Sequence, residues 1–188
     1  LKEIAQIESE HPEFHTNEMD ESVDHYVQYV EQVFAAAKVR TLDALLEVEV
    51  RVNLEGWAHG CFGTSDAIVI ADGVMTVIDF KYGKGKPVSS IDNPQMMIYA
   101  LGALDAYQDL YDIEQVNMVI IQPRIDNDSM WSKSVDELRM WAEWVLQPNA
   151  ERINTLPSNR LNFMPGKHCD FCKHAGQCQA LAQQNLEA

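Results

Sequence analysis

The chain has 188 residues and a formal net charge of -15, with 46% hydrophobic and 23% charged residues. This mixture predicts a globular protein with a core and argues against a disordered or fibrous chain. The acidic balance argues against a protein that coats nucleic acid, although it leaves room for a local basic groove. We expect a cytoplasmic, non-membrane protein, because no stretch approaches the roughly 20 apolar residues of a spanning helix.

The sequence begins at Leu1 without a Met, so we expect a fragment of a longer protein. Its first residues, about 1–10, have a helix-like pattern. A second helix is predicted from Glu18 to Lys38, where apolar residues recur at three and four positions, as one face of an amphipathic helix requires.

From Leu46 to Leu54 apolar and polar residues alternate, with valines between charged or polar residues. This period predicts a half-buried strand. After a glycine-rich break, the run Asp66–Ala71 predicts a second strand, and Val74–Phe80 predicts a third. Asp72 and Gly73 between them predict a tight turn, so these strands should form an antiparallel meander.

The second half of the chain adds a helix from about Pro94 to Tyr111, a strand at Gln115–Gln122 and a helix at Ser134–Leu156. This order predicts an α/β fold with a mixed central β-sheet flanked by helices. The last segment, Phe163–Ala188, is short and rich in cysteine. We therefore expect one domain over residues 1–162 and a Cys-rich tail over residues 163–188 that packs on it.

Two acids and a lysine are expected to meet where the second and third strands pair. Pairing across the turn places Asp66 beside Asp79, and Lys81 shares a face with Asp79 because strand side chains alternate. Oxygen ligands of this kind select hard divalent ions such as Mg²⁺ or Mn²⁺. A bound ion lowers the pKa of its water and polarises a phosphate, while an ammonium offsets charge on the phosphoryl oxygens. The residues thus favour metal-dependent phosphodiester cleavage.

Three short motifs follow one another in the chain: GxxD at Gly63–Asp66, DxK at Asp79–Lys81 and QxxxY at Gln95–Tyr99. Together they resemble the PD-(D/E)XK nuclease superfamily, and within it the RecB-type exonuclease branch with its phage and prophage members. The resemblance covers roughly Glu18 to Cys178. It implies a restriction-endonuclease-like core and an exonuclease that cuts DNA in phage or prophage recombination or repair, with DNA and a phage recombination protein as partners.

The same resemblance implies the roles of the central residues. Asp66 and Asp79 would be metal ligands, with the backbone carbonyl of Phe80 as a third. Lys81 would be catalytic, assisting the attack of a metal-bound water on phosphorus.

The resemblance also reaches the neighbouring elements. Gln95 and Tyr99, one helical turn apart, would hold the site or the DNA backbone. Glu49 on the first strand matches a frequently acidic position, although the sequence does not separate it from Glu47. The family usually supplies a His or Glu from an early helix, and His25 is the candidate unless the true residue lies upstream of the fragment.

Other interpretations stay open at this stage. A single DxK on a strand edge is usually an exposed surface pair, and it is the three motifs in order that favour a nuclease site. The alternative is a non-catalytic DNA- or protein-binding module that keeps the nuclease fold, which the acidic composition favours. A second alternative is a structural metalloprotein with an incidental Asp–Lys set.

Lys84 and Lys86 either contact phosphate or lie in a solvated loop. His59 and Trp57 are interpreted as residues that pack in the loop.

The tail contains the pattern C-x2-C-x5-C at Cys169, Cys172 and Cys178, with His168 and His174 nearby. Because cytosolic thiols stay reduced, the spacing favours metal binding over a disulfide. The iron-sulfur branch of the RecB-type nucleases has a similar tail, which implies a structural [4Fe-4S] cluster. Zinc held by the three Cys with one His, or no bound metal, are the alternatives.

A fourth cluster ligand is missing from the expected place. The remaining cysteine, Cys61, stands just before the GxxD motif and not in the early region where the family has its fourth ligand. We expect that ligand to lie upstream of Leu1.

Overall fold

The computed structural model describes residues 15–157 and 162–187. The helix predicted at about 1–10 lies outside these ranges. By its internal contacts the chain divides into two compact units, residues 1–148 and residues 149–188. The predicted boundary between residues 162 and 163 stays a prediction, as does the packing of the tail. Among the described residues, no helix is long and apolar enough to cross a membrane.

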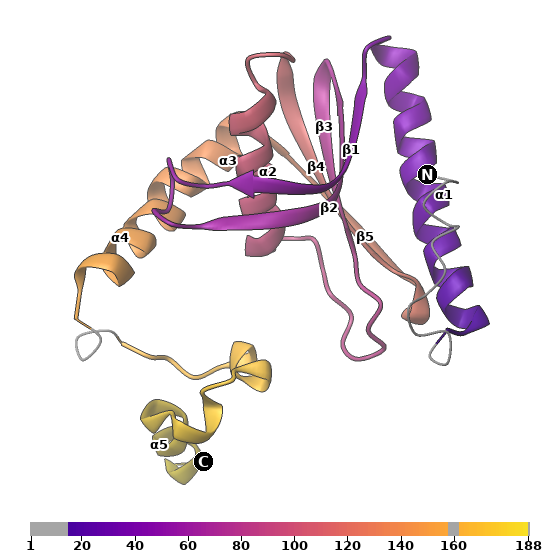
Figure 1. Cartoon of the computed structure of the whole chain (residues 1–188). Helices are drawn as coiled ribbons and strands as arrows, with labels where there is room; N and C mark the ends of the chain where they lie inside the picture. The colour runs from indigo at the N-terminus through magenta and orange to yellow at the C-terminus, as the bar shows by residue number, and fades with distance from the viewer. Residues whose placement is uncertain (1–14, 158–161, 188) are drawn as a thin grey trace. The chain divides into compact units, whose positions relative to one another are not determined.

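A mixed β-sheet forms the centre of the first unit (Figure 1). β1 pairs with β2 and β2 with β3 in antiparallel fashion, whereas β4 runs parallel to β3 and β5 antiparallel to β4. The α/β fold with a mixed sheet is therefore confirmed. In the described part of the chain this sheet has five strands, which are β1 (Leu45–Asn53), β2 (Phe62–Ala71), β3 (Gly73–Phe80), β4 (Ile113–Gln122) and β5 (Asn127–Ser134).

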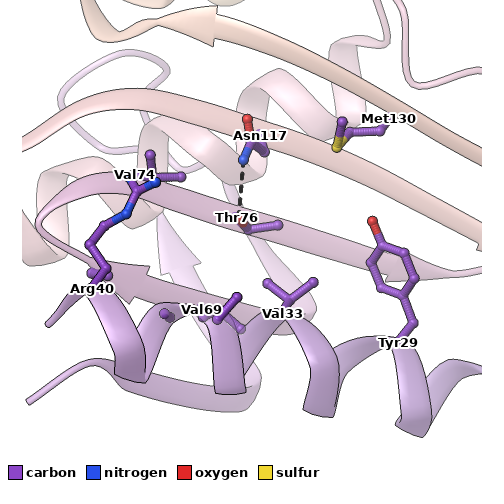
Figure 2. A pocket seen from close by; sticks show the side chains of 11 residues that line it. Tyr29, Val33, Arg40, Val69, Val74, Thr76, Asn117 and Met130 are labelled. Carbon is purple, nitrogen blue, oxygen red and sulfur yellow. Dashed lines mark hydrogen bonds between the residues drawn. The ribbon is translucent and has the colours of Figure 1, made fainter. Parts of the chain in front are cut away.

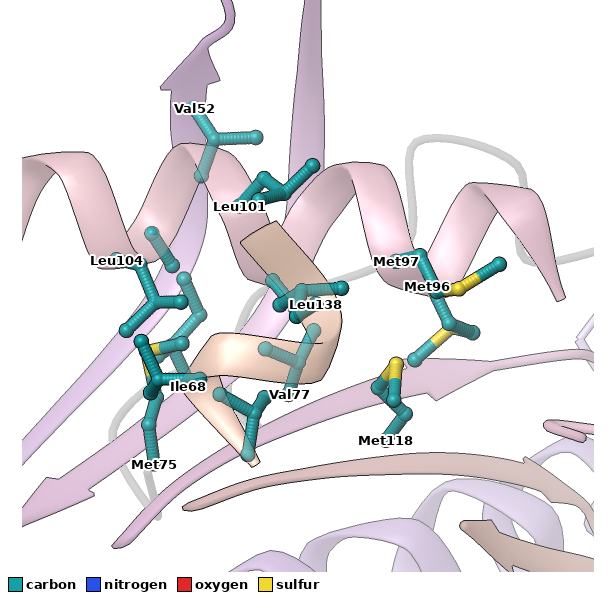
Figure 3. Close-up of a cluster of buried hydrophobic side chains, with 14 of the residues drawn as sticks. Val52, Ile68, Met75, Val77, Met96, Met97, Leu101, Leu104, Met118 and Leu138 are labelled. Carbon is teal, nitrogen blue, oxygen red and sulfur yellow. The ribbon is translucent and has the colours of Figure 1, made fainter. Parts of the chain in front are cut away.

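Helices cover both faces of the sheet. α1 (Asn17–Arg40) packs on one face, and α2 (Pro94–Tyr107) with α3 (Val135–Trp141) on the other (Figure 1). The larger core lies on the α2 side, where helix and strand side chains interdigitate (Figure 3). Since both faces are covered, the central strands are almost continuously apolar, as strands buried on two sides must be.

The helix α2 lies close to β1 because a glycine faces the strand. A Cβ added at Gly102 would stand 2.8 Å from the Cβ of Val52, so a larger residue would push the two elements apart. The helix begins where Asn93 caps it: the Asn93 side chain accepts hydrogen bonds from the backbone N–H of Gln95 at 3.0 Å and of Met96 at 3.4 Å. With proline as the first helical residue, this start is well defined.

On the other face, α1 leaves a groove of about 210 Å³ beside β3 and β4. Its walls are mostly apolar, and a 3.4 Å hydrogen bond joins Asn117 to Thr76 across its floor (Figure 2). The exposed Met130 of β5 stands at one end and Arg40 at the other. It carries no pair of acids, which sets it apart from the site described below.

Most predicted elements are observed with shifted ends. β2 begins at Phe62 instead of Asp66, and α2 ends at Tyr107 instead of Tyr111. The helix predicted from 134 to 156 is interrupted by a π-helical turn at Ala142–Leu146 before α4 (Gln147–Thr155). β5 was not predicted, because this edge strand is mostly polar and none of its residues is fully buried.

Candidate active site

The capped start of α2 places Gln95 against the end of β3. Its Nε2 donates hydrogen bonds to Oδ1 of Asp79 at 3.0 Å and to the hydroxyl of Tyr99 at 3.1 Å, one turn further along the helix. The Tyr99 ring in turn lies against Gly63, where an added Cβ would stand 2.5 Å from the ring. The glycine of GxxD and the tyrosine of QxxxY are thus in steric contact, which the sequence alone did not reveal.

Asp79 is the buried centre of this cluster, with 4% of its side chain exposed. The Lys81 ammonium lies 2.9 Å from Oδ2 and 3.2 Å from Oδ1 of Asp79, and donates to Oε1 of Gln95 at 3.3 Å. Oδ2 nevertheless accepts no well-directed hydrogen bond from any described residue. The structure therefore brings together four of the predicted residues, Asp79, Lys81, Gln95 and Tyr99, and leaves Oδ2 of Asp79 in contact with the Lys81 ammonium without a well-directed hydrogen bond.

Asp66 approaches the same strand end from β2. The pairing of β2 with β3 ends at Ala67 and Ile78. The next position in this register sets Asp66 of β2 across from Asp79 of β3. One oxygen of Asp66 accepts a 2.7 Å hydrogen bond from the backbone N–H of Phe80. Burial raises the pKa of Asp79, the Lys81 ammonium opposes this rise, and the nearby Asp66 carboxylate adds to it.

A third acid reaches this region through a change of face in β1. Leu46 contacts the core under α1, whereas Val50 and Val52 contact the core under α2. The reversal occurs at Glu49, whose φ of 52° lies in the left-handed region that non-glycine residues rarely adopt. Glu49 and Asp66 consequently line one pocket of about 410 Å³ together with Phe80 and side chains of α1.

This pocket separates the two acids that the sequence could not distinguish. Glu49 lies in it, whereas the charge of Glu47 raises the pKa of Tyr107 on α2. Of the two, Glu49 is therefore the acid that shares a pocket with Asp66, and its role as a metal ligand stays a prediction.

The α1 residue at the site is Tyr26, which the sequence analysis counted only as part of an apolar helical face. Its hydroxyl is buried with no hydrogen-bond partner in the described ranges. Burial raises the pKa of Tyr26, and the charges of Asp66, Asp79 and Glu49 raise it further. The candidate His25 instead lies 2.8 Å from Asp128 of β5.

The donor set fits a hard divalent ion held by few protein ligands. Mg²⁺ is usually bound through one or two carboxylates, its remaining positions being filled by water and substrate phosphates. Asp79 offers Oδ2 and Asp66 offers the oxygen that Phe80 does not occupy. Among residues 15–157 and 162–187, no three His, Cys, Asp or Glu side chains already converge as a metal cage. The Phe80 carbonyl as a third ligand stays a prediction.

Gln122 organises the loop that follows Lys81 and was missed from the sequence. This buried side chain accepts a hydrogen bond from Val88 N–H at 3.1 Å and donates to the carbonyls of Gly83 at 3.0 Å and Lys86 at 3.2 Å. A single amide at the end of an apolar strand gives no sequence signal for such a role. The loop is thereby fixed beside the site.

A family described as "Protein of unknown function (DUF2800)" matches residues 2–188, nearly the whole sequence. The chain belongs to the DUF2800 family. Among solved structures, one entitled "Crystal structure of SSO0001" is similar at 19% identity, with a TM-score of 0.37. The match covers 85% of this chain and 71% of that chain.

The cysteine tail of this DUF2800 chain does not form a metal centre in the described arrangement. Cys169, Cys172 and Cys178 are free thiols around two 3₁₀ turns, Lys167–Phe171 and Ala175–Gln177. They do not converge with each other or with a histidine as ligands in the part of the chain that is described. The [4Fe-4S] cluster and the zinc alternative, with His168 or His174, stay predictions.

The other residues near the site in sequence make local contacts. His59 is hydrogen-bonded to Glu55 in the β1–β2 connection, and Trp57 Nε1 donates to Asp105 at 2.9 Å. Cys61 packs against the core on the α2 side. These contacts agree with the interpretation of His59 and Trp57 as loop packing.

Proposed function

We propose that this protein is a metal-dependent DNA nuclease whose site is built on Asp66, Asp79 and Lys81. The observation that carries the proposal is the buried Asp79 carboxylate, whose Oδ2 lies 2.9 Å from the Lys81 ammonium but accepts no well-directed hydrogen bond from the described residues, and on which the charge of Asp66 acts. Buried polar atoms are nearly always hydrogen-bonded, so an exception of this kind points to a ligand that the protein is built to receive. The negative charge of Asp66, which acts on Asp79, makes that ligand a cation.

The raised pKa of Asp79 supports the same conclusion. Burial disfavours the ionised carboxylate more than Lys81 favours it, so the charged form is costly in the metal-free protein. A divalent cation between Asp79 and Asp66 would offset both the burial and the repulsion between the two acids. A purely structural Asp–Lys pair would gain nothing from the second acid.

Each residue of the cluster has a role that follows from its contacts. A bound Mg²⁺ or Mn²⁺ would supply an acidified water and polarise the phosphate. Lys81, held by Asp79 and Gln95, presents an ammonium that can stabilise charge on the phosphoryl oxygens. Gln95 fixes both Asp79 and Lys81, and Tyr99 fixes Gln95. These last two are positioning residues.

The substrate class rests on the motifs. GxxD, DxK and QxxxY occur in the order and on the elements seen in RecB-type exonucleases, which favours DNA as substrate and cleavage from a strand end. We therefore propose an exonuclease of phage or prophage recombination or repair, acting in the cytoplasm with a recombination protein as partner. The non-catalytic binding module that keeps the fold is the rival that the net charge of -15 favours.

A cleavage assay tests this proposal. The protein would be incubated with Mn²⁺ and with linear or closed circular DNA, alongside Asp79→Ala and Lys81→Ala. Lys133→Ala is the matched control, because Lys133 pairs with Val116 at the opposite end of the sheet. We expect linear DNA to be degraded, circular DNA to be spared and both site variants to be inactive. Cleavage unaffected by either site variant, or DNA binding with no cleavage, would contradict the proposal.

A further inference from the structure

A second ion cluster lies on the loop that leads away from the site. Lys84 of this loop stands 2.6 Å from one carboxylate oxygen of Glu18, and Arg124 stands 2.9 Å from the other. Glu18 lies in the first turn of α1, and Arg124 in the 3₁₀ turn Pro123–Ile125 after β4. Three elements distant in the sequence therefore meet at one carboxylate.

Arg124 is held in a fixed orientation within this cluster. Its guanidinium lies 4.3 Å from the centre of the Tyr82 ring, and Nη1 donates to the Tyr82 carbonyl at 3.4 Å. The Nε–H is buried and has no acceptor among the described residues. A planar guanidinium with an unused donor, already immobilised on an aromatic ring, is suited to bind a further oxygen of a tetrahedral anion.

The carboxylate of Glu18 lies where a phosphate group could bind to the two cations. Its carboxylate places a negative charge at the N-terminal end of α1, where phosphate groups also bind because of the exposed N–H groups and the helix dipole. Both oxygens contact cations, as two oxygens of a phosphate would. The side chain is 45% exposed, so it can leave without opening the core.

The cluster is connected to the cleavage site by aromatic side chains. The Tyr82 ring lies 6.3 Å from that of Phe80, which lies 5.1 Å from that of Tyr26. Glu18 and Tyr26 are eight residues apart on α1, which is roughly 12 Å along the helix axis. A strand with one phosphate at Asp79 could therefore reach Arg124 within a few nucleotides.

We propose that Arg124 and Lys84 form a phosphate-binding site for the DNA strand beside the cleavage site, and that Glu18 occupies this site in the free protein. The identity of the ligand as DNA rests on the proposed function. The two cations hold the pKa of Glu18 below its usual range, and the carboxylate is ionised at neutral pH with or without this shift. DNA phosphate exchanges with an internal carboxylate, which limits unproductive binding.

Binding measured without cleavage tests the proposal. A fluorescent single-stranded oligonucleotide would be titrated in EDTA, so that no divalent ion is present, and anisotropy recorded. Glu18→Gln should tighten binding about threefold, since the exchange of an exposed ion pair changes affinity by a small factor. The matched control is Glu21→Gln, an exposed acid on the same helix, which alters net charge equally. A gain equal to that of the control would overturn the competition by Glu18.

The opposite change should weaken binding. Arg124→Gln should lower affinity about tenfold and reduce the salt dependence by the equivalent of about one phosphate contact. Thermal unfolding would establish that the variant folds, and Lys84→Gln, whose side chain is 54% exposed, provides a second variant with less structural risk. Affinity and salt dependence unchanged in both variants would overturn the phosphate site.

A parallel titration with inorganic phosphate separates the two sources of the phosphate group. An effect of Glu18→Gln on the oligonucleotide supports a DNA strand, whereas an effect on inorganic phosphate alone overturns DNA as the occupant. Failure of the proposed function would give a different result. The protein would not cleave DNA with Mn²⁺, but Glu18→Gln would still bind the oligonucleotide in EDTA more tightly than the wild type, and Arg124→Gln more weakly.

Discussion

Two ion clusters, each with acidic and basic side chains, lie around the loop after β3. They differ in the burial of their carboxylates, Asp79 in the first and Glu18 in the second. In the first cluster the carboxylate of Asp79 is 4% exposed and Lys81 30% exposed, and Gln95 is hydrogen-bonded to both. In the second cluster Glu18 is 45% and Lys84 54% exposed, whereas Arg124, at 20%, is less exposed than Lys81. Buried charges interact strongly and cannot lose a partner without cost, while exposed pairs are weak and exchangeable. Burial therefore suits the first cluster to catalysis and the second to reversible binding.

The same substitution in both clusters should separate their roles most strongly. Lys81→Gln removes the charge that we propose acts in the transition state, so kcat should fall by about 10²–10³. Lys84→Gln removes a contact made equally in ground and transition states, so its effect should appear in KM. Steady-state kinetics on linear DNA with Mn²⁺ would measure both. A Lys84→Gln defect confined to kcat would contradict the division between the clusters.

Gly63→Ala should test how closely the catalytic cluster is packed. The new methyl group would stand 2.5 Å from the Tyr99 ring and displace it from Gln95. We expect a loss of about 1–3 kcal/mol in the free energy of unfolding, as for other overpacked sites. Urea denaturation would measure it. Gly56→Ala is the control, because nothing lies within 4 Å of the added Cβ, and equal losses would show that Tyr99 tolerates displacement.

Asp79→Asn should stabilise the metal-free fold at neutral pH. Because the folded-state pKa of Asp79 is raised, its favourable contribution is complete below the unfolded pKa and is lost as pH rises through the folded pKa. The amide lacks this ionisation, so in EDTA the variant should melt above the wild type at pH 7, and the difference should shrink on acidification. Melting curves from pH 3 to pH 8 would measure this. A gap that widens in acid would reverse the assigned direction.

Saturating Mn²⁺ should reverse that order. A ligand at 100 times its Kd stabilises by about 2.7 kcal/mol, a gain that only the protein with an intact site receives. The wild type should then melt above Asp79→Asn.

Glu18→Gln should have the smallest effect on stability. Its ion pairs with Lys84 and Arg124 are accessible to solvent, so the loss in melting temperature should be smaller than for Gly63→Ala. The remaining difference should vanish near 1 M salt, where the screening length is about 3 Å. Melting at low and high salt would measure it, and a difference that survives high salt would place the pair in the buried class.

The positions of the residues in the proposed catalytic cluster could be predicted because they lie on regular elements. Alternation in β2 and β3 predicted that Asp66 and Asp79 would stand opposite each other, and the spacing of Gln95 and Tyr99 predicted one helical face. These are consequences of fixed periods, so they survive small errors in the element ends. The change of face at Glu49 was not predictable, because it depends on one unusual φ angle.

Long-range polar contacts limited what the sequence could show. Arg124 meets Glu18 across more than a hundred residues, and Gln122 fixes a loop from the end of an apolar strand. In the sequence, Tyr26 is one of several apolar residues on a face of α1, and only the folded structure brings it near the acids Asp66, Asp79 and Glu49. Such pairs arise from tertiary packing and have no local pattern.

Binding of Mn²⁺ to the wild type, Asp66→Asn, Asp79→Asn and Lys133→Gln tests the central claim most directly. Isothermal titration in the absence of DNA would give the affinity of each. We expect the wild type and Lys133→Gln to bind Mn²⁺ with the same affinity and both site variants to lose that binding. Equal affinity in all four proteins would contradict a cation shared by Asp66 and Asp79.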